Sequence, residues 1–139
     1  MVTSGADPLG DQGTMPNPYL DSAIADAQRA GIVVYAIYTP AEGHSGHSFW
    51  RMNWDQNHLG ELADETGGEA YMLGFGAPVS IQPYLADLTA RLTHQYRIGF
   101  LAKGEAKAGL KTIRLTTEVP NAEVVGANKV YVPAQSRAH

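Results

Sequence analysis

Helical and strand-like hydrophobic patterns alternate along the first two thirds of the chain. Between residues 18 and 30 the apolar positions recur every three or four residues, the spacing of one face of an amphipathic helix: Leu20, Ala23, Ile24, Ala27 and Ala30. Asn17 precedes this stretch, with Pro18 at the first helical position, and Gly31 follows it. Asparagine caps helix N-termini and glycine accepts the left-handed conformation at their C-termini, so the pattern predicts a helix over residues 18–30.

Two short apolar runs have the pattern of buried strands. Residues 32–38 are almost continuously apolar, and residues 69–73 form a second, shorter run. Such runs are typical of parallel strands that are covered on both faces. A further strand is expected near residues 1–4, before a glycine turn. Because a helical stretch separates each strand from the next, both connections are expected to be right-handed crossovers.

Two more helices are expected, one before and one after the run at residues 69–73. Asp55 or Asn57 caps the first and Gly67-Gly68 ends it, and its inner face consists of Leu59, Leu62, Ala63 and Thr66. Ser80 caps the second, and its apolar stripe consists of Ile81, Leu85, Leu88 and Leu92. The spacing of this stripe predicts that it is buried.

The last third of the chain alternates apolar and polar residues and lacks a helical period. Residues 96–101, 111–119 and 129–132 are therefore expected to be half-exposed antiparallel strands. The whole pattern predicts an α/β fold, with three parallel strands and their helices over residues 1–95 and an antiparallel extension over 96–139. At 139 residues the chain fits one domain or part of one.

Composition narrows the classes of function. Fourteen acidic and ten basic side chains give a net charge of −4, whereas nucleic-acid-binding proteins carry a clustered basic surplus, so nucleic acid is not an expected partner. The chain has no cysteine, which excludes disulfides and thiolate metal sites. Its longest apolar run, residues 32–38, is far shorter than the ~20 residues that span a bilayer, and its first residues lack the layout of a signal peptide. Insertion into a membrane is not expected.

Sequence motifs for catalysis and cofactor binding are absent. The turn at Gly74-Phe75-Gly76 lacks the third glycine of a dinucleotide fingerprint, and the chain has neither a Gly-Lys-Ser/Thr phosphate loop nor a Gly-x-Ser-x-Gly nucleophile elbow. We therefore expect no cofactor and no enzymatic activity.

Residues 40–57 read as a connection much longer than the ~4–6 residues usual between elements, so a functional loop is expected there. Four residues in or near it have side chains that ligate zinc or nickel: Glu42, His44, His47 and His58. Histidines flanked by glycine are also common in solvated loops, so both interpretations stay open.

Four large apolar residues fall within six positions of the same stretch: Phe49, Trp50, Met52 and Trp54. Four large apolar side chains this close together are not expected all to be exposed to water. Either they pack over the end of the sheet, or they form a patch that contacts another protein.

Several strings resemble a known family: VTSGAD at the start, AQRAGIVVYAIYT, LADETGGEAY, and QYRIGFLAKG. Together they are similar to the second half of a von Willebrand factor type A domain, most of all to the group found in acidobacteria. The resemblance implies a partial Rossmann-like, three-layer fold with strand order 3-2-1-4-5-6, in which this chain holds strands four to six. It also suggests a bacterial protein of the exported or cell-envelope kind.

The resemblance also bears on metal binding. Adhesive members of this family bind a divalent cation through an Asp-x-Ser-x-Ser loop after the first strand and an aspartate after strand four. That first loop belongs to the part of the domain that this chain lacks. At the strand-four position stands Ser4, with Asp7 displaced by three residues. The resemblance therefore implies a degenerate site without metal, and Ser4 and Asp7 are expected to form a turn capped by local hydrogen bonds.

Two classes of function remain. The first is a non-catalytic protein-interaction or assembly module related to von Willebrand type A domains and independent of metal. The alternative is a metal-dependent binding protein or hydrolase that uses the set Glu42, His44, His47 and His58.

Self-association is the expected mode of assembly. A chain that starts within strand four leaves one side of that strand unpaired, and the helices at 18–30 and 80–94 lose apolar neighbours. We expect a closed homo-oligomer with residues 1–6 or the strands after residue 96 in the interface, and residues 49–54 close to it.

Overall fold

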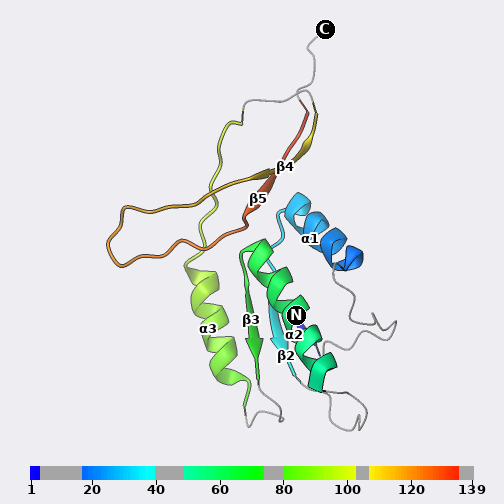
Figure 1. The fold of residues 1–139 in the computed structure, drawn as a ribbon. Helices are drawn as coiled ribbons and strands as arrows, with labels where there is room; N and C mark the ends of the chain where they lie inside the picture. The colour runs from blue at the N-terminus through cyan, green and yellow to red at the C-terminus, as the bar shows by residue number, and fades with distance from the viewer. Residues whose placement is uncertain (4–16, 40–48, 74–79, 103–106, 135–139) are drawn as a thin grey trace.

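The computed structural model describes residues 1–3, 17–39, 49–73, 80–102 and 107–134 (Figure 1). The side chains of residues 49–52 and 54 are not described. Along the chain the elements are β1 (Val2–Thr3), α1 (Pro18–Ala30), β2 (Tyr35–Tyr38), α2 (Phe49–Thr66), β3 (Glu69–Met72), α3 (Gln82–Thr93), β4 (Gly109–Thr112) and β5 (Lys129–Val132). The fold is α/β, as the alternating patterns predict.

A parallel sheet forms the centre of the fold. Its strand order is β1-β2-β3, and both pairs are parallel. In the register of the sheet Val2 lies opposite Ile37, and Ile37 lies opposite Tyr71. The three expected parallel strands are therefore confirmed, although β2 begins at Tyr35 and is shorter than the apolar run 32–38.

Helix α1 has the bounds and both caps that the sequence predicts. The Asn17 side-chain oxygen accepts hydrogen bonds from the backbone N–H groups of Tyr19 and Leu20, at 3.0 and 3.2 Å. Gly31 has a φ of 66°, in the left-handed region that favours glycine. Its N–H donates to the Gln28 carbonyl, and the N–H of Ile32 donates to the Ala27 carbonyl.

Helix α2 begins at Phe49, so two predictions about its start are wrong. Residues 49–57 are helical rather than part of a connection that runs to residue 57, and Asp55 and Asn57 are not caps. The physical reason is that no glycine or proline interrupts residues 49–59, so nothing in the backbone stops the helix from extending toward the N-terminus.

The end of α2 is tied to the start of β2. The Thr66 hydroxyl is fully buried, donates to the carbonyls of its own last turn and accepts a hydrogen bond from the Val34 N–H at 3.1 Å. Gly67 follows with a φ of 80°. A Cβ atom on Gly67 would lie 2.4 Å from the Ala127 nitrogen, and one on Gly68 would lie 1.9 Å from the Val34 carbonyl oxygen. Both glycines are therefore needed because backbone passes directly over them.

Helices α1 and α2 pack against each other, and α2 covers β2 and β3. The core between them consists of Ile24, Ala36, Tyr38 and Ala63, whereas Ile37, which is also buried, lies on the opposite face of the sheet. Burial, and the Asp55 carboxylate to a lesser degree, raise the pKa of the Tyr38 phenol. Two polar residues, Gln28 and Thr66, are buried in the same layer.

Strands β4 and β5 form a separate antiparallel pair that packs against α1 (Figure 1). Their position corrects the predicted C-terminal strands. Residues 129–132 are a strand as expected, but the partner strand is 109–112 rather than 111–119. Residues 96–101 are not a strand, because no other strand lies beside them in the described part of the chain.

A polar junction joins this antiparallel pair to the helices. The Gln28 amide nitrogen donates to the Glu65 carbonyl oxygen at 2.7 Å and to the Asn128 side-chain oxygen at 3.0 Å. The Lys129 ammonium lies 3.8 Å from the Glu65 carboxylate. The junction therefore connects α1, the last turn of α2 and the start of β5.

Candidate protein-interaction surface

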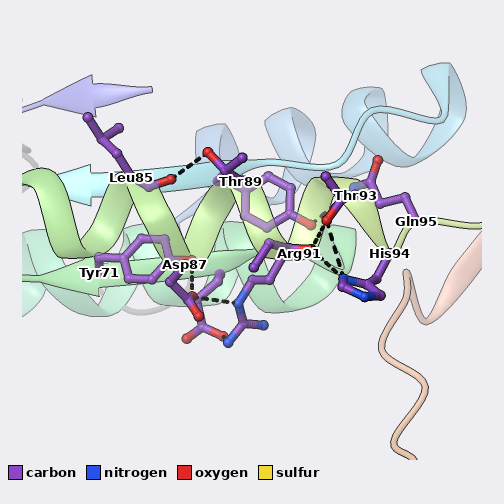
Figure 2. A network of polar contacts seen from close by, with 11 residues as sticks. Tyr71, Leu85, Asp87, Thr89, Arg91, Thr93, His94 and Gln95 are labelled. Atoms are coloured by element: carbon purple, nitrogen blue, oxygen red, sulfur yellow. Dashed lines mark hydrogen bonds and ion pairs between the residues drawn. The ribbon is translucent and has the colours of Figure 1, made fainter.

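Helix α3 is held on the sheet by polar contacts. In a strand alternate side chains face opposite sides, so Tyr35, Ile37, Glu69 and Tyr71 share one face of the sheet. On that face the Tyr71 hydroxyl donates to the Asp87 carboxylate at 2.6 Å, and the Gln95 amide donates to the Tyr35 hydroxyl at 3.1 Å (Figure 2). The opposite face, which includes Met72, is the one that α2 covers.

Asp87 is the centre of this polar network. Its carboxylate also accepts a hydrogen bond from the Arg91 Nε at 2.8 Å, and Arg91 in turn lies 3.2 Å from the Glu69 carboxylate. Burial, followed by the hydrogen bond to Asp87, raises the pKa of Tyr71 to about 12. The hydrogen bond from Tyr71 lowers the pKa of Asp87. A phenol with such a pKa stays protonated at neutral pH and remains a hydrogen-bond donor to Asp87, so the network holds α3 on the sheet.

The apolar stripe of α3 is exposed, which contradicts the prediction that it is buried. Ile81, Leu85 and Leu92 are 38, 42 and 50% exposed, Leu88 is half-buried, and no residue of α3 is buried. The reason is rotation: at ~100° per residue, the stripe lies about a third of a turn around the helix from Asp87 and Arg91, which contact the sheet. We refer to Ile81, Leu85 and Leu92 as the α3 stripe.

The α3 stripe lies on the side of α3 that is directed toward β2 and β1 rather than toward β3. Figure 2 shows Leu85 on one side of α3 and Asp87 and Arg91 on the other. The contact of Gln95 with Tyr35 shows that β2 lies on the side away from Asp87. Val2 of β1, which shares this sheet face with Ile37, is 59% exposed. Val2 is therefore an exposed apolar residue on the same sheet face that α3 contacts.

The segment that follows α3 is also apolar and exposed. Tyr96, Ile98, Phe100 and Leu101 are 87, 63, 56 and 103% exposed. Within the part of the chain that the structure describes, residues 96–101 make no hydrogen bond. Residues 96–101 are called the 96–101 segment. The α3 stripe and the 96–101 segment together are called the α3 surface.

A hollow of about 490 Å³ lies between α2 and the end of β3, beside the free edge of the sheet. Its lining includes Gln56, Asn57, Gly60, Glu61, Asp64 and Met72. Glu61 and Asp64 are exposed, and among the described residues neither has a cation at ion-pair distance. Glu65, whose carboxylate lies near Lys129, also lines the hollow, so one apolar side chain is combined with two carboxylates that lack such a cation within the described chain and attract positive charge.

Most of the residues proposed from sequence as metal or adhesion sites lie outside the described ranges: Ser4, Asp7, Glu42, His44 and His47. His58 is described; it is half-buried on α2 and takes part in an interaction. In the described ranges no three histidine, aspartate or glutamate residues lie close enough to hold a metal ion. The histidine-based site stays a prediction.

The aromatic residues proposed as an interface patch lie in the first two turns of α2: Phe49, Trp50, Met52 and Trp54. They are helical rather than in a loop, and the packing of their side chains stays untested. Sequence reasoning did not place the interaction surface on α3 itself. The sequence does contain a signal for it, because two sets of residues lie on different sides of this helix. The apolar stripe forms one side, and the polar positions 84, 87 and 91 share another.

Comparison with protein-family models, with curated proteins and with solved structures finds no match. The family resemblance therefore rests on the residues themselves. Among the helices that the structure describes, none is long and apolar enough to cross a membrane.

Proposed function

We propose that this chain is a non-catalytic protein-interaction module of the von Willebrand type A-related kind, which binds protein through the α3 surface without metal. The observation that carries the proposal is the exposure of the α3 stripe and the 96–101 segment. Contiguous apolar surface of this extent, bordered by polar residues, marks protein-binding sites on soluble proteins.

The area of the α3 surface fits this role. Aromatic side chains bury ~150–250 Å² each, so the exposed parts of Tyr96 and Phe100 alone offer roughly 200–350 Å². A specific interface buries about 800 Å² on each partner. The three residues of the α3 stripe and the remaining apolar residues of the segment supply much of the difference.

The proposed fold family is supported by the arrangement of the sheet. Three consecutive parallel strands lie in chain order, α2 covers one face, and α3 contacts the other. Strands four, five and six of a von Willebrand type A domain have this order. The three-layer, Rossmann-like identity is part of the proposal.

Photo-crosslinking tests the proposed function without assuming a partner. A benzophenone amino acid replaces Leu85 in cells that express the natural protein, and Ser22, an exposed residue of α1, is the matched control position. We expect a crosslinked protein product from position 85 that is several-fold stronger than that from position 22 and that persists in chelator.

Two outcomes would count against the proposal. Equal crosslinking from positions 85 and 22 would mean that the α3 surface binds nothing. Loss of the product in chelator would favour the metal-dependent alternative with its histidines. The substitution Leu92→Asp, at a side chain that is 50% exposed, should abolish the product while the protein remains folded.

A further inference from the structure

The free edge of β3 and the 96–101 segment are complementary. Strand β3 pairs with β2 only, so alternate backbone groups on its other side have no partner in the described residues. The 96–101 segment lacks a partner strand. It alternates apolar with other residues, as a strand does, but pairs with no strand among the described residues. An open edge and an unpaired strand-forming segment satisfy each other's hydrogen bonds.

The same chain holds these two parts away from each other. Figure 1 shows the chain leaving the end of α3 and running away from the sheet toward β4. Strands β4 and β5 pack on α1, and the Gln28 junction fixes the start of β5. We therefore propose that the 96–101 segment of one copy adds as a strand to the free edge of β3 in a second copy. The inference rests on the proposed function, because the 96–101 segment is part of the α3 surface and the inference names a second copy as the partner of that part.

The hollow beside β3 gives the added strand a specific partner for one charged side chain. Alternate residues of an added strand face α2, so one register directs Arg97 toward the hollow and Tyr96, Ile98 and Phe100 toward α3. Arg97 has no carboxylate partner among the described residues, and Glu61 and Asp64 at the hollow have no cation. The charges of the two surfaces are therefore complementary.

The side chains on the other face of the added strand, at positions 96, 98 and 100, have space beside α3. The side of α3 that faces away from β2 carries Ala86 and Ala90, which are small and exposed. Large side chains at 96, 98 and 100 can lie beside these alanines and lose contact with water. Because each copy has one free edge on β3 and one segment, reciprocal exchange closes a two-fold dimer.

Disulfide trapping tests the pairing directly, because the natural chain has no cysteine. One protein carries Asp64→Cys and a second carries Arg97→Cys, and the two are mixed and mildly oxidised. We expect a two-chain product at least five-fold above that from the matched control mixture of Asp64→Cys with Arg114→Cys. Arg114 is an exposed arginine outside the segment.

A chain that carries both cysteines separates pairing between copies from pairing within one chain. We expect the double variant to form two-chain products whose yield falls on dilution. A single-chain disulfide that is independent of concentration would overturn the proposal, as would mixtures that give no more product than the control.

Proline substitution provides a second measurement. Ile98→Pro removes one backbone donor and disfavours the added strand, yet residue 98 makes no hydrogen bond within the described chain, so the melting temperature of the folded monomer should not change. We expect sedimentation velocity to show a dimer for wild type and for the control Thr116→Pro, and a monomer for Ile98→Pro. An unaltered dimer in Ile98→Pro would contradict strand addition.

Charge exchange tests the role of Arg97. Arg97→Glu should weaken the dimer by about two- to fivefold, the effect of one exposed ion pair, and mixing it with Asp64→Lys should restore the affinity. If dimerisation fails in all these tests while Leu85 still crosslinks to another protein, the proposed function survives and only the second copy is excluded as the partner.

Discussion

Gly68 shows how one missing side chain allows two elements to meet. The Val34 carbonyl lies where its Cβ would be, so the turn after α2 closes against the start of β2 only with glycine there. Gly60 differs, because nothing lies within 4 Å of the Cβ that alanine would add. The same substitution therefore has opposite consequences at the two positions.

We expect Gly68→Ala to destabilise the fold by about 2–4 kcal/mol, because backbone has to move to admit the methyl group. The matched control, Gly60→Ala in the interior of α2, should stabilise it by about 0.5–1 kcal/mol, since alanine loses less backbone entropy in a helix. Urea unfolding measures both. Equal effects of the two substitutions would show that backbone does not approach Gly68 closely.

The Tyr71 phenol is expected to titrate late. Its pKa in the folded protein is about 12, above the ordinary value of 10.0, so the contribution of this phenol to stability is present below pH 10 and is lost as the pH rises through 12. The difference between the ultraviolet titrations of wild type and Tyr71→Phe isolates this group. Asp87→Asn should lower its midpoint, and a midpoint that does not move would mean that the hydrogen bond to Asp87 is absent.

Ser4 and Asp7 are expected to bind no divalent ion stoichiometrically. A hard cation needs several oxygens from separate loops, and the sequence brings too few to this position. Elemental analysis of the purified protein and a magnesium or manganese titration of the melting temperature measure this. A rise in melting temperature that disappears in Asp7→Ala would prove the expectation wrong.

At the scale of elements, sequence patterns predict an element well where local chemistry determines its bounds. Helix α1 has a side-chain cap at Asn17 and a left-handed glycine at Gly31, and it forms over the predicted residues. The start of α2 has no such cap signal, and the pattern predicts a start that lies C-terminal to the observed one at Phe49. The exposure of α3 was not predictable from its own residues, because it depends on which side of the helix Tyr71 and Glu69 hold against the sheet.

The candidate site was predictable only in part for the same reason. Alternation at 96–101 indicates a strand, but a strand also needs a neighbour, and its absence within the described chain is a property of the tertiary structure. The hollow beside β3 brings Met72 near residues of α2 from Gln56 to Glu65, which are 7 to 16 positions earlier in the chain. A local sequence pattern does not predict such a contact between residues of different elements.

The α3 stripe is expected to contribute little to the stability of the monomer. Leu85→Gln and Leu92→Gln should each change the free energy of unfolding by less than about 1 kcal/mol, because both leucines are already about half exposed to water. Ile24→Ala, which truncates a buried residue of α1, is the comparison and should cost about 2–5 kcal/mol. A large loss from either leucine substitution would mean that the stripe is part of the core.

At the scale of the molecule, the Gln28 junction is the polar link between the helices and the β4–β5 pair. We expect Gln28→Ala to speed hydrogen exchange in residues 109–112 and 129–132 more than in α2, because the buried partners at Glu65 and Asn128 lose their donor. Gln82→Ala, which removes an exposed glutamine side chain of α3, serves as the control. Uniform faster exchange across both sheets would show that the junction stabilises the whole fold rather than this attachment.

The hydrogen bond between Gln28 and Asn128 joins residues 100 positions apart. During synthesis at ~5–20 residues per second, α1 therefore leaves the ribosome about 5–20 s before its partner in the junction exists. Throughout that interval the parallel sheet and its helices can assemble, while the Gln28 amide is still bonded to water. Attachment of the β4–β5 pair therefore follows synthesis of the parallel sheet and its helices, and until Asn128 is made the part of α1 that the pair contacts is open to water.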